Sequence, residues 1–391
     1  MSIKRLIVTA VILLAIITAG LFILRLKFST TSFKDLNQGL QYLVSDLVKN
    51  DESVKNCVVS VMRGDGSFSW SGAAGIARQD GQVPMTKDTP IHLASITKLY
   101  TAAIIMRLYE KGALSLDDPM SRYLPEGLIK GIHLYKGKDY SHEINIKQLL
   151  SHTSGIADYY TEKPKGGKSV FELLLENPEH TWKEDETIEW ARDKLEANFR
   201  PGTDASYSDT NFDLLGKIIE AITGQLRHTV YEDFIFRPLG LTHTWLIESS
   251  APQIPILPAD VFYKQRDITT IRSNAAYWPY MISTAEEMII FLKALNEGRI
   301  VSRDTLKLMH NWHKLQFPLQ YGFGTMYFKL PPLMTRITKI SPLWGHSGST
   351  GSFLYYCQDQ DLYLAGTIDQ VDSKIKPFML MMKVLKALQS K

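Results

Sequence analysis

Strand-like segments lie at the two ends of this chain, and the long middle between them is helical and rich in loops. Near the N-terminal end, residues 57–62 and 67–77 predict two strands joined by a tight turn at Arg63–Gly66. Strand-like segments return near the other end, at residues 343–348, 352–358 and 362–368. This order predicts an α/β lobe built by both ends of the chain, with a helical lobe inserted between them.

The expected helices support the same arrangement. Residue patterns predict helices over 33–48, 95–111, 283–298 and 376–388. Gly112 is the expected stop of the second helix, and Ser283 or Thr284 is the expected N-cap of the third. The first and last of these helices would flank the sheet. A ligand site is expected in the cleft between the two lobes.

A run of 19 residues without a charge, Leu6–Leu24, precedes the first strands. A helix needs roughly 20 apolar residues to cross a bilayer, so this length is sufficient. A cleaved signal peptide usually has a shorter apolar core, about 7–15 residues, and small residues at its cleavage site. We therefore predict a membrane anchor within residues 1–28, with a signal peptide as the alternative, followed by a single folded domain over residues 33–391.

Composition excludes some functions and leaves others open. The chain has 391 residues, a net charge of +3 and no basic stripe with interleaved aromatic residues, so nucleic acid is not an expected partner. Its two cysteines, Cys57 and Cys357, lie in strand-like segments and are too few for a four-thiolate zinc site. They are predicted to be buried free thiols. No cofactor or metal site is predicted, and the sequence does not determine the oligomeric state.

A serine and a lysine three residues apart, Ser95 and Lys98, lie in the apolar stretch HLASITKLYTA. Three residues is almost one helical turn, so the two side chains would share a face. A serine hydroxyl needs a base to take its proton, and apolar surroundings would favour the neutral amine that can do so. The start of the helix also offers N–H groups for a developing oxyanion. The spacing alone is weak evidence, because Ser373 and Lys376 share it; the alternative is a helix cap beside a lysine that extends to solvent.

Two further segments carry polar residues suited to the same chemistry. The segment FRPGTDASYSDTNFDLLG contains Tyr207, whose hydroxyl could relay protons, and Asp209 two residues later. The segment WGHSGSTGSF carries His346 on a predicted strand, and its small residues would let a substrate backbone approach closely.

Together these three elements resemble the penicillin-recognising serine hydrolases, whose motifs are Ser-x-x-Lys, a polar triplet and a Lys-Thr-Gly-like strand. The match is closer to the branch of class C β-lactamases and DD-peptidases, with Tyr-x-Asn as second motif and sometimes His-x-Gly as third. The resemblance covers most of residues 35–390 and includes, in the family's order, LSLDDPMSRYLPE, IKQLLSHTSGIADY, FRPLGLTHT and YGFG. It implies an α/β two-lobed β-lactamase/transpeptidase-like fold, with an antiparallel sheet flanked by the terminal helices and an inserted all-helical lobe.

The resemblance also implies a role for each matching residue. Ser95 would be the acylated nucleophile, Lys98 its partner base and Tyr207 the proton relay between the serine and the leaving group. His346 would take the place of the strand cation that helps to bind the substrate and tunes the tyrosine. The family signature at His152–Gly155 is expected to be structural and to shape the helical lobe.

The remaining residues are implied to bind the substrate. The backbone N–H groups of Ser95 and Ser349 would form the oxyanion hole. Asp209, Ser347, Gly348 and Ser349 would contact the substrate around it.

Three departures from the family pattern limit the inference about substrate. Asp209 stands where the family usually has asparagine, and a carboxylate accepts hydrogen bonds but donates none. It could pair with Lys98 and make it a poorer base, favour a substrate amine, or hold a β-lactam side-chain amide badly. His346 would be only partly cationic near neutral pH, which weakens recognition of a substrate carboxylate. Tyr277, Trp278 and Tyr280 either narrow the cleft or fill the interface between the lobes.

The sequence thus predicts a membrane-anchored serine hydrolase that forms an acyl-enzyme on Ser95 with a peptide, amide or ester. A DD-peptidase-like or D-amino-acid peptidase activity and an esterase activity are the leading alternatives, and efficient β-lactamase activity is less favoured because of Asp209 and the anchor. The domain is expected outside the cytoplasm, on a single membrane span, or secreted if the segment is cleaved. The alternative from another class is a non-catalytic membrane-tethered protein that keeps the fold for binding.

Overall fold

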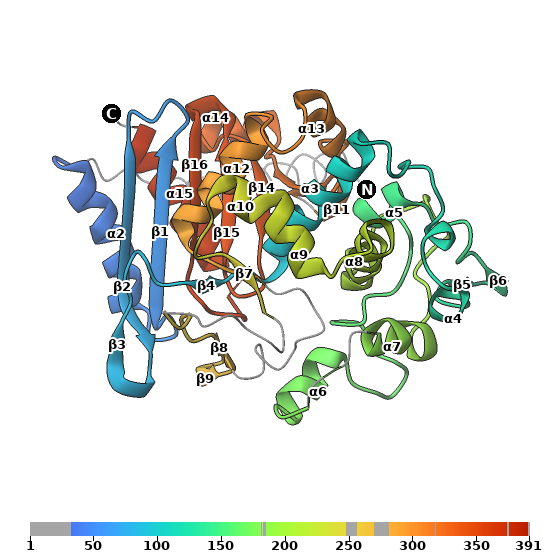
Figure 1. Cartoon of the computed structure of the whole chain (residues 1–391). Helices are drawn as coiled ribbons and strands as arrows, with labels where there is room; N and C mark the ends of the chain where they lie inside the picture. The colour runs from blue at the N-terminus through green and yellow to red at the C-terminus, as the bar shows by residue number, and fades with distance from the viewer. Residues whose placement is uncertain are drawn as a thin grey trace, which may run out of the picture.

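Nine antiparallel strands form the main sheet of the computed structural model, which describes residues 33–180, 182, 185–247, 256–269, 281–316, 318–373 and 375–389. Their order across the sheet is β11-β12-β13-β14-β15-β16-β1-β2-β3. The N-terminal part of the chain supplies β1 (Asn56–Arg63), β2 (Ser69–Arg78) and β3 (Val83–Pro84). The C-terminal part supplies β11 (His313–Gln316), β12 (Leu319–Tyr321), β13 (Met326–Phe328), β14 (Leu343–Ser347), β15 (Phe353–Cys357) and β16 (Leu362–Thr367). Both parts therefore build one sheet, as the sequence predicts (Figure 1).

Strand β1 joins the two halves of the sheet. Val59 lies opposite Gly366 of β16 on one side and opposite Gly72 of β2 on the other. The predicted turn between β1 and β2 is present, with the N–H of Gly66 donating to the carbonyl of Arg63 at 3.0 Å. Gly66 has a φ of +75°, which a residue with a side chain adopts only at a cost.

The two faces of the sheet are covered by different helices. Alternate residues of β1 point to opposite sides: Cys57 and Val59 pack with α2 (Leu36–Asn50) and α15 (Ile375–Gln389), whereas Val58 joins the core that contains α12 (Ala285–Asn296). The predicted terminal helices therefore share one face of the sheet. Cys57 and Cys357 are both buried and free, which confirms the prediction for the thiols.

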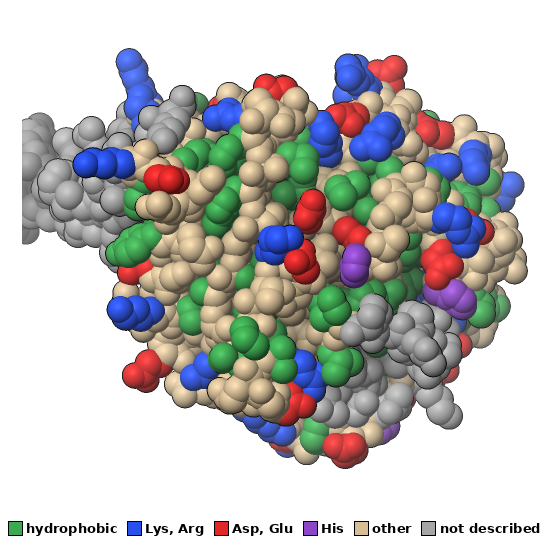
Figure 2. Space-filling model, turned by 60° about the vertical axis from the view of Figure 1, so that its left-hand side comes forward, with side chains coloured by type: hydrophobic (Ala, Val, Ile, Leu, Met, Phe, Trp, Pro, Cys, Tyr) green, Lys and Arg blue, Asp and Glu red, His purple; other side chains and the backbone are tan. Residues whose placement is uncertain are grey.

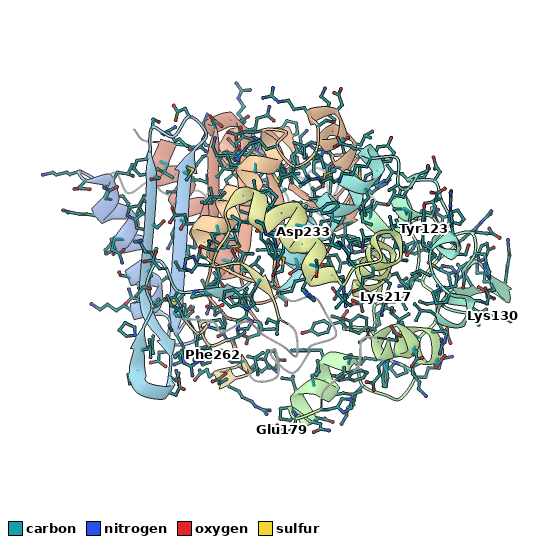
Figure 3. The ribbon with its side chains drawn as sticks, in the orientation of Figure 1. Tyr123, Lys130, Glu179, Lys217, Asp233 and Phe262 are labelled. Carbon is teal, nitrogen blue, oxygen red and sulfur yellow. The ribbon has the colours of Figure 1, made fainter. Side chains whose placement is uncertain are left out.

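The helical lobe occupies the middle of the chain and lies on the right of Figure 1. It contains α4 (Glu126–Ile129), α5 (Ile146–Leu150), α6 (Val170–Glu176), α7 (Glu186–Lys194) and α8 (Asp209–Thr223), with one small hairpin of β5 (Leu134–Tyr135) and β6 (Lys138–Asp139). Figure 3 places Tyr123, Lys130 and Lys217 in this lobe, and Phe262 below the sheet on the other side. The predicted two-lobed fold with an inserted helical lobe is thus observed.

Short elements connect the two lobes. A three-stranded sheet pairs β4 (Ile91–His92) and β7 (Trp245–Leu246) with β10 (Met281–Ser283), and α3 (Thr97–Glu110) follows β4. Thr284 is the N-cap of α12, because its side chain accepts the N–H of Glu287 at 3.2 Å; Ser283, the other candidate, ends β10. The remaining α-helices and strands of the described ranges are α9 (Arg227–Tyr231), α10 (Arg237–Leu239), α13 (Arg303–Met309), α14 (Pro332–Thr338), β8 (Phe262–Tyr263) and β9 (Arg266–Asp267).

The sequence predicts that the protein does not bind nucleic acid and that its N-terminal segment anchors it in a membrane. Figure 2 shows basic and acidic side chains interspersed over one face of the molecule, which fits a net charge of only +3. None of the helices in the described ranges has the length and apolar character needed to cross a bilayer. The predicted anchor, Leu6–Leu24, lies outside the described residues.

Gly366 provides a test of how closely the two halves of the sheet pack. A Cβ on this glycine would collide with the backbone carbonyl of Val58 on β1 and would lie 2.9 Å from the ring of Phe353. We expect Gly366→Ala to lower the free energy of unfolding by about 1–3 kcal/mol, because neither neighbour can move freely. Urea denaturation followed by circular dichroism measures this change.

Gly127 is the matched control for this substitution. It lies in α4 with nothing within 4 Å of an added Cβ. Gly127→Ala should therefore leave stability unchanged or raise it by about 0.5–1 kcal/mol. Equal stabilities for Gly366→Ala and the wild type would contradict the packing described for β1 and β16.

Candidate active site

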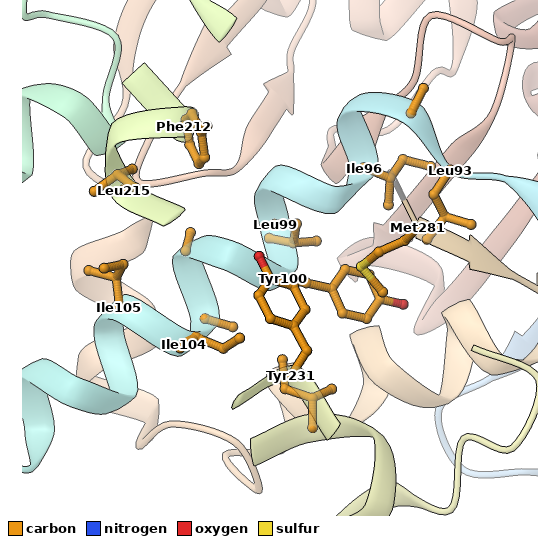
Figure 4. Close-up of a cluster of buried hydrophobic side chains, with 14 of the residues drawn as sticks. Leu93, Ile96, Leu99, Tyr100, Ile104, Ile105, Phe212, Leu215, Tyr231 and Met281 are labelled. Atoms are coloured by element: carbon orange, nitrogen blue, oxygen red, sulfur yellow. The ribbon is translucent and has the colours of Figure 1, made fainter. Parts of the chain in front are cut away.

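Helix α3 runs through the core, and this burial sets the environment of its polar residues. Figure 4 shows Leu99, Ile104 and Ile105 of α3 surrounded by apolar side chains of α8 and other elements. Tyr100 of the same helix stacks on Phe291 of α12, with ring centroids 3.5 Å apart. The helix is therefore enclosed on several sides, and the side chain of Lys98 is only 1% exposed.

Ser95 lies where the chain turns sharply from β4 into α3. The helix predicted to begin at Ser95 starts as a 3₁₀ turn, Ala94–Ile96, and becomes α-helical at Thr97. Ala94 has a φ of +48°, a left-handed conformation that costs free energy for any residue with a Cβ. Ser95 remains partly exposed although its immediate neighbours are buried. The strained turn thus presents the serine at the start of a buried helix.

The turn that follows β14 is hydrogen-bonded to the segment just before Ser95. The hydroxyls of Thr350 and Ser352 donate to the carbonyls of His92 and Leu93, each at 2.9 Å. A Cβ on Gly348 would collide with the carbonyl of Leu93, so this position needs a glycine. These contacts bring the 348–352 turn alongside the residues that precede Ser95. The oxyanion hole implied for Ser95 and Ser349 stays a prediction, and Ser349 itself is exposed.

The ammonium group of Lys98 connects the first and second motifs. Its Nζ lies 3.3 Å from Oγ of Ser95 and forms an ion pair with Oδ1 of Asp209, the first residue of α8. It also lies 5.1 Å from the ring centroid of Tyr207 and 5.7 Å from that of Phe212. Ser95, Lys98, Tyr207 and Asp209 are therefore brought together as the sequence predicts, and the pairing of Asp209 with Lys98 is observed.

Tyr207 is a neutral phenol at this site. Burial, reinforced by the charge of Asp209, raises its pKa well above the usual value, while the hydroxyl of Ser95 lowers it. Its hydroxyl oxygen is buried and has no hydrogen bond of normal geometry within the described ranges. A neutral hydroxyl close to Ser95 can donate a proton to a leaving group, which fits the relay predicted for Tyr207.

Asp158 is a residue of the site that the sequence reasoning missed. It is 3% exposed, and its Oδ1 accepts the N–H of Asp209 at 2.9 Å. Burial, together with the nearby charge of Asp209, raises the pKa of Asp158 above its usual range. Asp158 therefore places a second carboxyl group beside the one that pairs with Lys98. The signal was present in the stretch HTSGIADY, but nothing in its spacing assigns a partner to the aspartate.

His152 also lies at the site, although the sequence predicts only a structural role for it. Its Nδ1 lies 3.2 Å from the N–H of Ser208, and its ring lies 4.3 Å from that of Tyr207 and 4.4 Å from that of Tyr321. Burial and the charge of Lys98 lower the pKa of His152 well below its usual value. The signature at 152–155 thus holds the second motif in place and is not limited to shaping the helical lobe.

His346 corrects one prediction. Because its Nδ1 lies 2.8 Å from the carbonyl of Ser347, the ring must donate there, and its Nε2 then accepts from the hydroxyl of Tyr321 at 2.9 Å. The residue is fully buried, and burial, followed by the charge of Lys98, lowers its pKa to about 3. His346 is therefore a neutral acceptor and not the partly charged strand cation that the sequence predicts. Tyr321 is a second residue that the sequence reasoning missed.

Ser347 corrects a second prediction. Side chains alternate along β14, so Ser347 lies on the opposite face from His346, and its Oγ is 2.7 Å from the hydroxyl of Tyr355. Only the backbone of Ser347 remains a candidate for substrate binding. The aromatic residues Tyr277, Trp278 and Tyr280 lie outside the described residues. Within the described ranges, no group of three or more His, Cys, Asp or Glu side chains is arranged to hold a metal ion.

A serine and a lysine beside a tyrosine, at the junction of a sheet lobe and a helical lobe, form the arrangement of a serine hydrolase site. The family model described as Beta-lactamase matches residues 46–374, well over half of the chain. The chain therefore belongs to the β-lactamase family, which confirms the predicted family, its serine hydrolase class and its fold.

Individual relatives cover smaller parts of the chain. The D-alanyl-D-alanine-carboxypeptidase/endopeptidase AmpH of Escherichia coli is 31% identical over 180 residues, 46% of this chain and 43% of that protein. The esterase EstB of Burkholderia gladioli is 31% identical over 185 residues, 47% of this chain and 45% of that protein. The chain thus spans less than half the length of these curated relatives.

Solved structures match over nearly the whole fold. A D-stereospecific amidohydrolase from Streptomyces sp. is 28% identical with a TM-score of 0.72, covering 88% of this chain and 97% of its own. The D-amino acid amidase from Ochrobactrum anthropi SV3 is 23% identical with a TM-score of 0.74, covering 91% of this chain and 99% of its own, and it supports the fold alone.

The neutral state of His346 predicts how stability changes with pH. A histidine with a lowered pKa binds its proton more readily in the unfolded chain than in the folded one. Its contribution to the free energy of unfolding is therefore complete above about pH 6.5 and is lost as the pH falls toward 3. The free energy of unfolding of the wild type should fall as the pH is lowered from about 6.5 to about 4.5. In His346→Gln we expect this fall to be smaller, by about 1.4 kcal/mol per pH unit. Urea denaturation at several pH values measures this slope.

His142 is the control, because its side chain is 51% exposed. His142→Gln should keep the slope of the wild type. The same slope in His346→Gln and the wild type would contradict the neutral, buried state assigned to His346.

Proposed function

We propose that this protein is a serine hydrolase that forms an acyl-enzyme on Ser95 with an amide or ester substrate. The observation that carries the proposal is the position of the Lys98 Nζ, 3.3 Å from the Ser95 Oγ in a buried environment. A serine becomes nucleophilic when such a neighbour can accept its proton. The strained Ala94 turn supports the same role, because it leaves Ser95 accessible at the start of α3.

The reaction follows from these positions. The Ser95 oxygen forms a bond to the substrate carbonyl carbon while its proton passes to the neutral amine of Lys98. The negative charge on the carbonyl oxygen is stabilised by the N–H groups proposed for Ser95 and Ser349. When the bond to the leaving group breaks, Tyr207 donates its proton to the departing nitrogen or oxygen and is reprotonated from Lys98. Water then attacks the acyl-enzyme by the reverse sequence, which releases the acid and restores Ser95.

The charges of the site favour substrates without a carboxylate next to the scissile bond. His346 is neutral, and among the described residues Lys98 is the cation whose charge lowers the pKa values of both His152 and His346. Lys98 is already paired with Asp209. A substrate carboxylate would therefore find little positive charge here. Amidase-like, peptidase-like and esterase-like activities are favoured over β-lactamase activity, and the relatives named as amidohydrolase and esterase support this range.

A non-catalytic binding protein is the second candidate, and one observation favours it. The Asp209 carboxylate forms an ion pair with Lys98, and this stabilises the charged ammonium, which cannot accept a proton. The two candidates differ in whether Ser95 reacts covalently.

Covalent labelling separates the two functions. We expect a fluorophosphonate to add to Ser95 of the wild type and not to react with Ser95→Ala, because the reagent needs an activated serine. Labelling by a fluorescent penicillin is expected to be weaker, since the described residues of the site offer no free cation to the penicillin carboxylate. Intact-protein and peptide mass spectrometry measure both reactions.

Ser373→Ala is the matched control, because Ser373 and Lys376 have the same spacing as Ser95 and Lys98 but Lys376 is paired with Asp51 outside the site. This variant should be labelled like the wild type. No adduct on Ser95 with either reagent would rule out the hydrolase and leave the binding protein.

The N-terminal segment Leu6–Leu24 is proposed to anchor the domain in a membrane, with the domain outside the cytoplasm. Its 19 residues without a charge support this proposal. We expect the full chain to stay in the membrane pellet after alkaline carbonate extraction, and a chain that lacks residues 1–28 to become soluble. Full-length Ser95→Ala should fractionate like the wild type. Release of the full chain by carbonate would contradict the anchor.

A further inference from the structure

We propose that Asp209 recognises a positively charged amino group of the substrate, so that the preferred substrates are amides or esters of amino acids whose amino group is free. This inference rests on the proposed acyl-enzyme at Ser95 and names the substrate class for that site. An asparagine at this position could donate a hydrogen bond to the substrate. The carboxylate of Asp209 cannot donate one, but it attracts a cation.

Asp209 has the position that such a role requires. Its side chain is 12% exposed, and its Oδ1 contacts the Lys98 Nζ, which in turn lies 3.3 Å from the Ser95 Oγ. Among the described residues, none forms a hydrogen bond or ion pair with its Oδ2. In an amino acid amide or ester the α-amino group is attached to the carbon next to the scissile carbonyl. A carbonyl held at Ser95 would therefore place its amino group close to Asp209.

The charge balance of the site points to a cationic ligand. Asp158 and Asp209 approach each other, because Oδ1 of Asp158 accepts the N–H of Asp209 at 2.9 Å, and Lys98 is the cation that pairs with Asp209. His152 and His346 are neutral because burial and Lys98 lower their pKa values. Burial, together with the charge of Asp209, raises the pKa of Asp158, so the described part of the site lacks the positive charge that would keep both carboxyl groups ionised. A substrate ammonium beside Asp209 would supply positive charge there.

Recognition of an amine would also help the reaction itself. Lys98 must be neutral to take the proton of Ser95, but its neutral form leaves the Asp209 carboxylate buried without a partner, which is costly. A substrate ammonium on Asp209 would replace the charge that Lys98 gives up. Substrates without an amino group would lack this compensation, so they would react more slowly even when they reach Ser95.

The competing explanation is that Asp209 serves only to position Lys98. In that case its replacement would change the reactivity of Ser95 toward every reagent equally, whether or not a cation is present. A selective effect on charged ligands separates the two roles.

The test measures how a small amine protects Ser95 from a fluorophosphonate. The probes are 2-phenylethylamine and its neutral analogue 2-phenylethanol. The variants are Asp209→Asn, Asp209→Glu and the exposed control Asp204→Asn from the loop that precedes α8. We expect the amine to slow labelling of the wild type, Asp209→Glu and Asp204→Asn at least about tenfold more effectively than the alcohol, which corresponds to about 1.4 kcal/mol. In Asp209→Asn this difference should disappear.

A second measurement does not depend on any variant. The wild type should hydrolyse phenylalanine p-nitroanilide, taking the better of its two enantiomers, at least about tenfold faster than 3-phenylpropionyl p-nitroanilide, which lacks only the amino group. Equal or reversed rates, equal protection by amine and alcohol, or amine protection that persists in Asp209→Asn would each overturn the inference. Labelling of Ser95 without amine selectivity would leave the proposed hydrolase intact, whereas no labelling of Ser95 would overturn both.

Discussion

The burial of the Lys98 ammonium is the constraint on which the rest of the site depends. A charged group that is 1% exposed must be paired, because the free energy of removing it from water is large. Asp209 provides the pair, and Asp158 fixes the start of α8 by accepting the N–H of Asp209. The same burial brings the Lys98 Nζ to the hydroxyl of Ser95. The pairing of Lys98 with Asp209 and the proximity of Lys98 to Ser95 therefore both depend on the burial of one amine among apolar helices.

Contacts between distant segments hold this arrangement together. The turn after β14 is fastened by Thr350 and Ser352 to the carbonyls just before the 3₁₀ turn of Ser95. From the other lobe, His152 binds the N–H of Ser208 and packs against Tyr207. The nucleophile is thus positioned by the sheet lobe and the proton relay by the helical lobe. A change in the distance between the lobes would alter the reacting groups directly.

Local sequence predicted much of the architecture because its signals act over short distances. The turn at Arg63–Gly66, an N-cap at Ser283 or Thr284 and the sheet shared by both chain ends all depend on turn residues, capping and periodicity. The charge state of His346 was not predictable in this way. Its side chain is enclosed by Tyr321, which is distant in sequence, and desolvation decides its protonation.

The sequence by itself determined which reactive residues this protein has and in what order: Ser95 and Lys98 one helical turn apart, then Tyr207 and Asp209, then His346. Tertiary structure decided their states and directions. It paired Lys98 with Asp209, placed Asp158 beside Asp209, made His346 neutral and directed Ser347 toward Tyr355. The physical reason is that protonation and side-chain partners depend on burial and on charges from segments far apart in the chain, which no local pattern encodes.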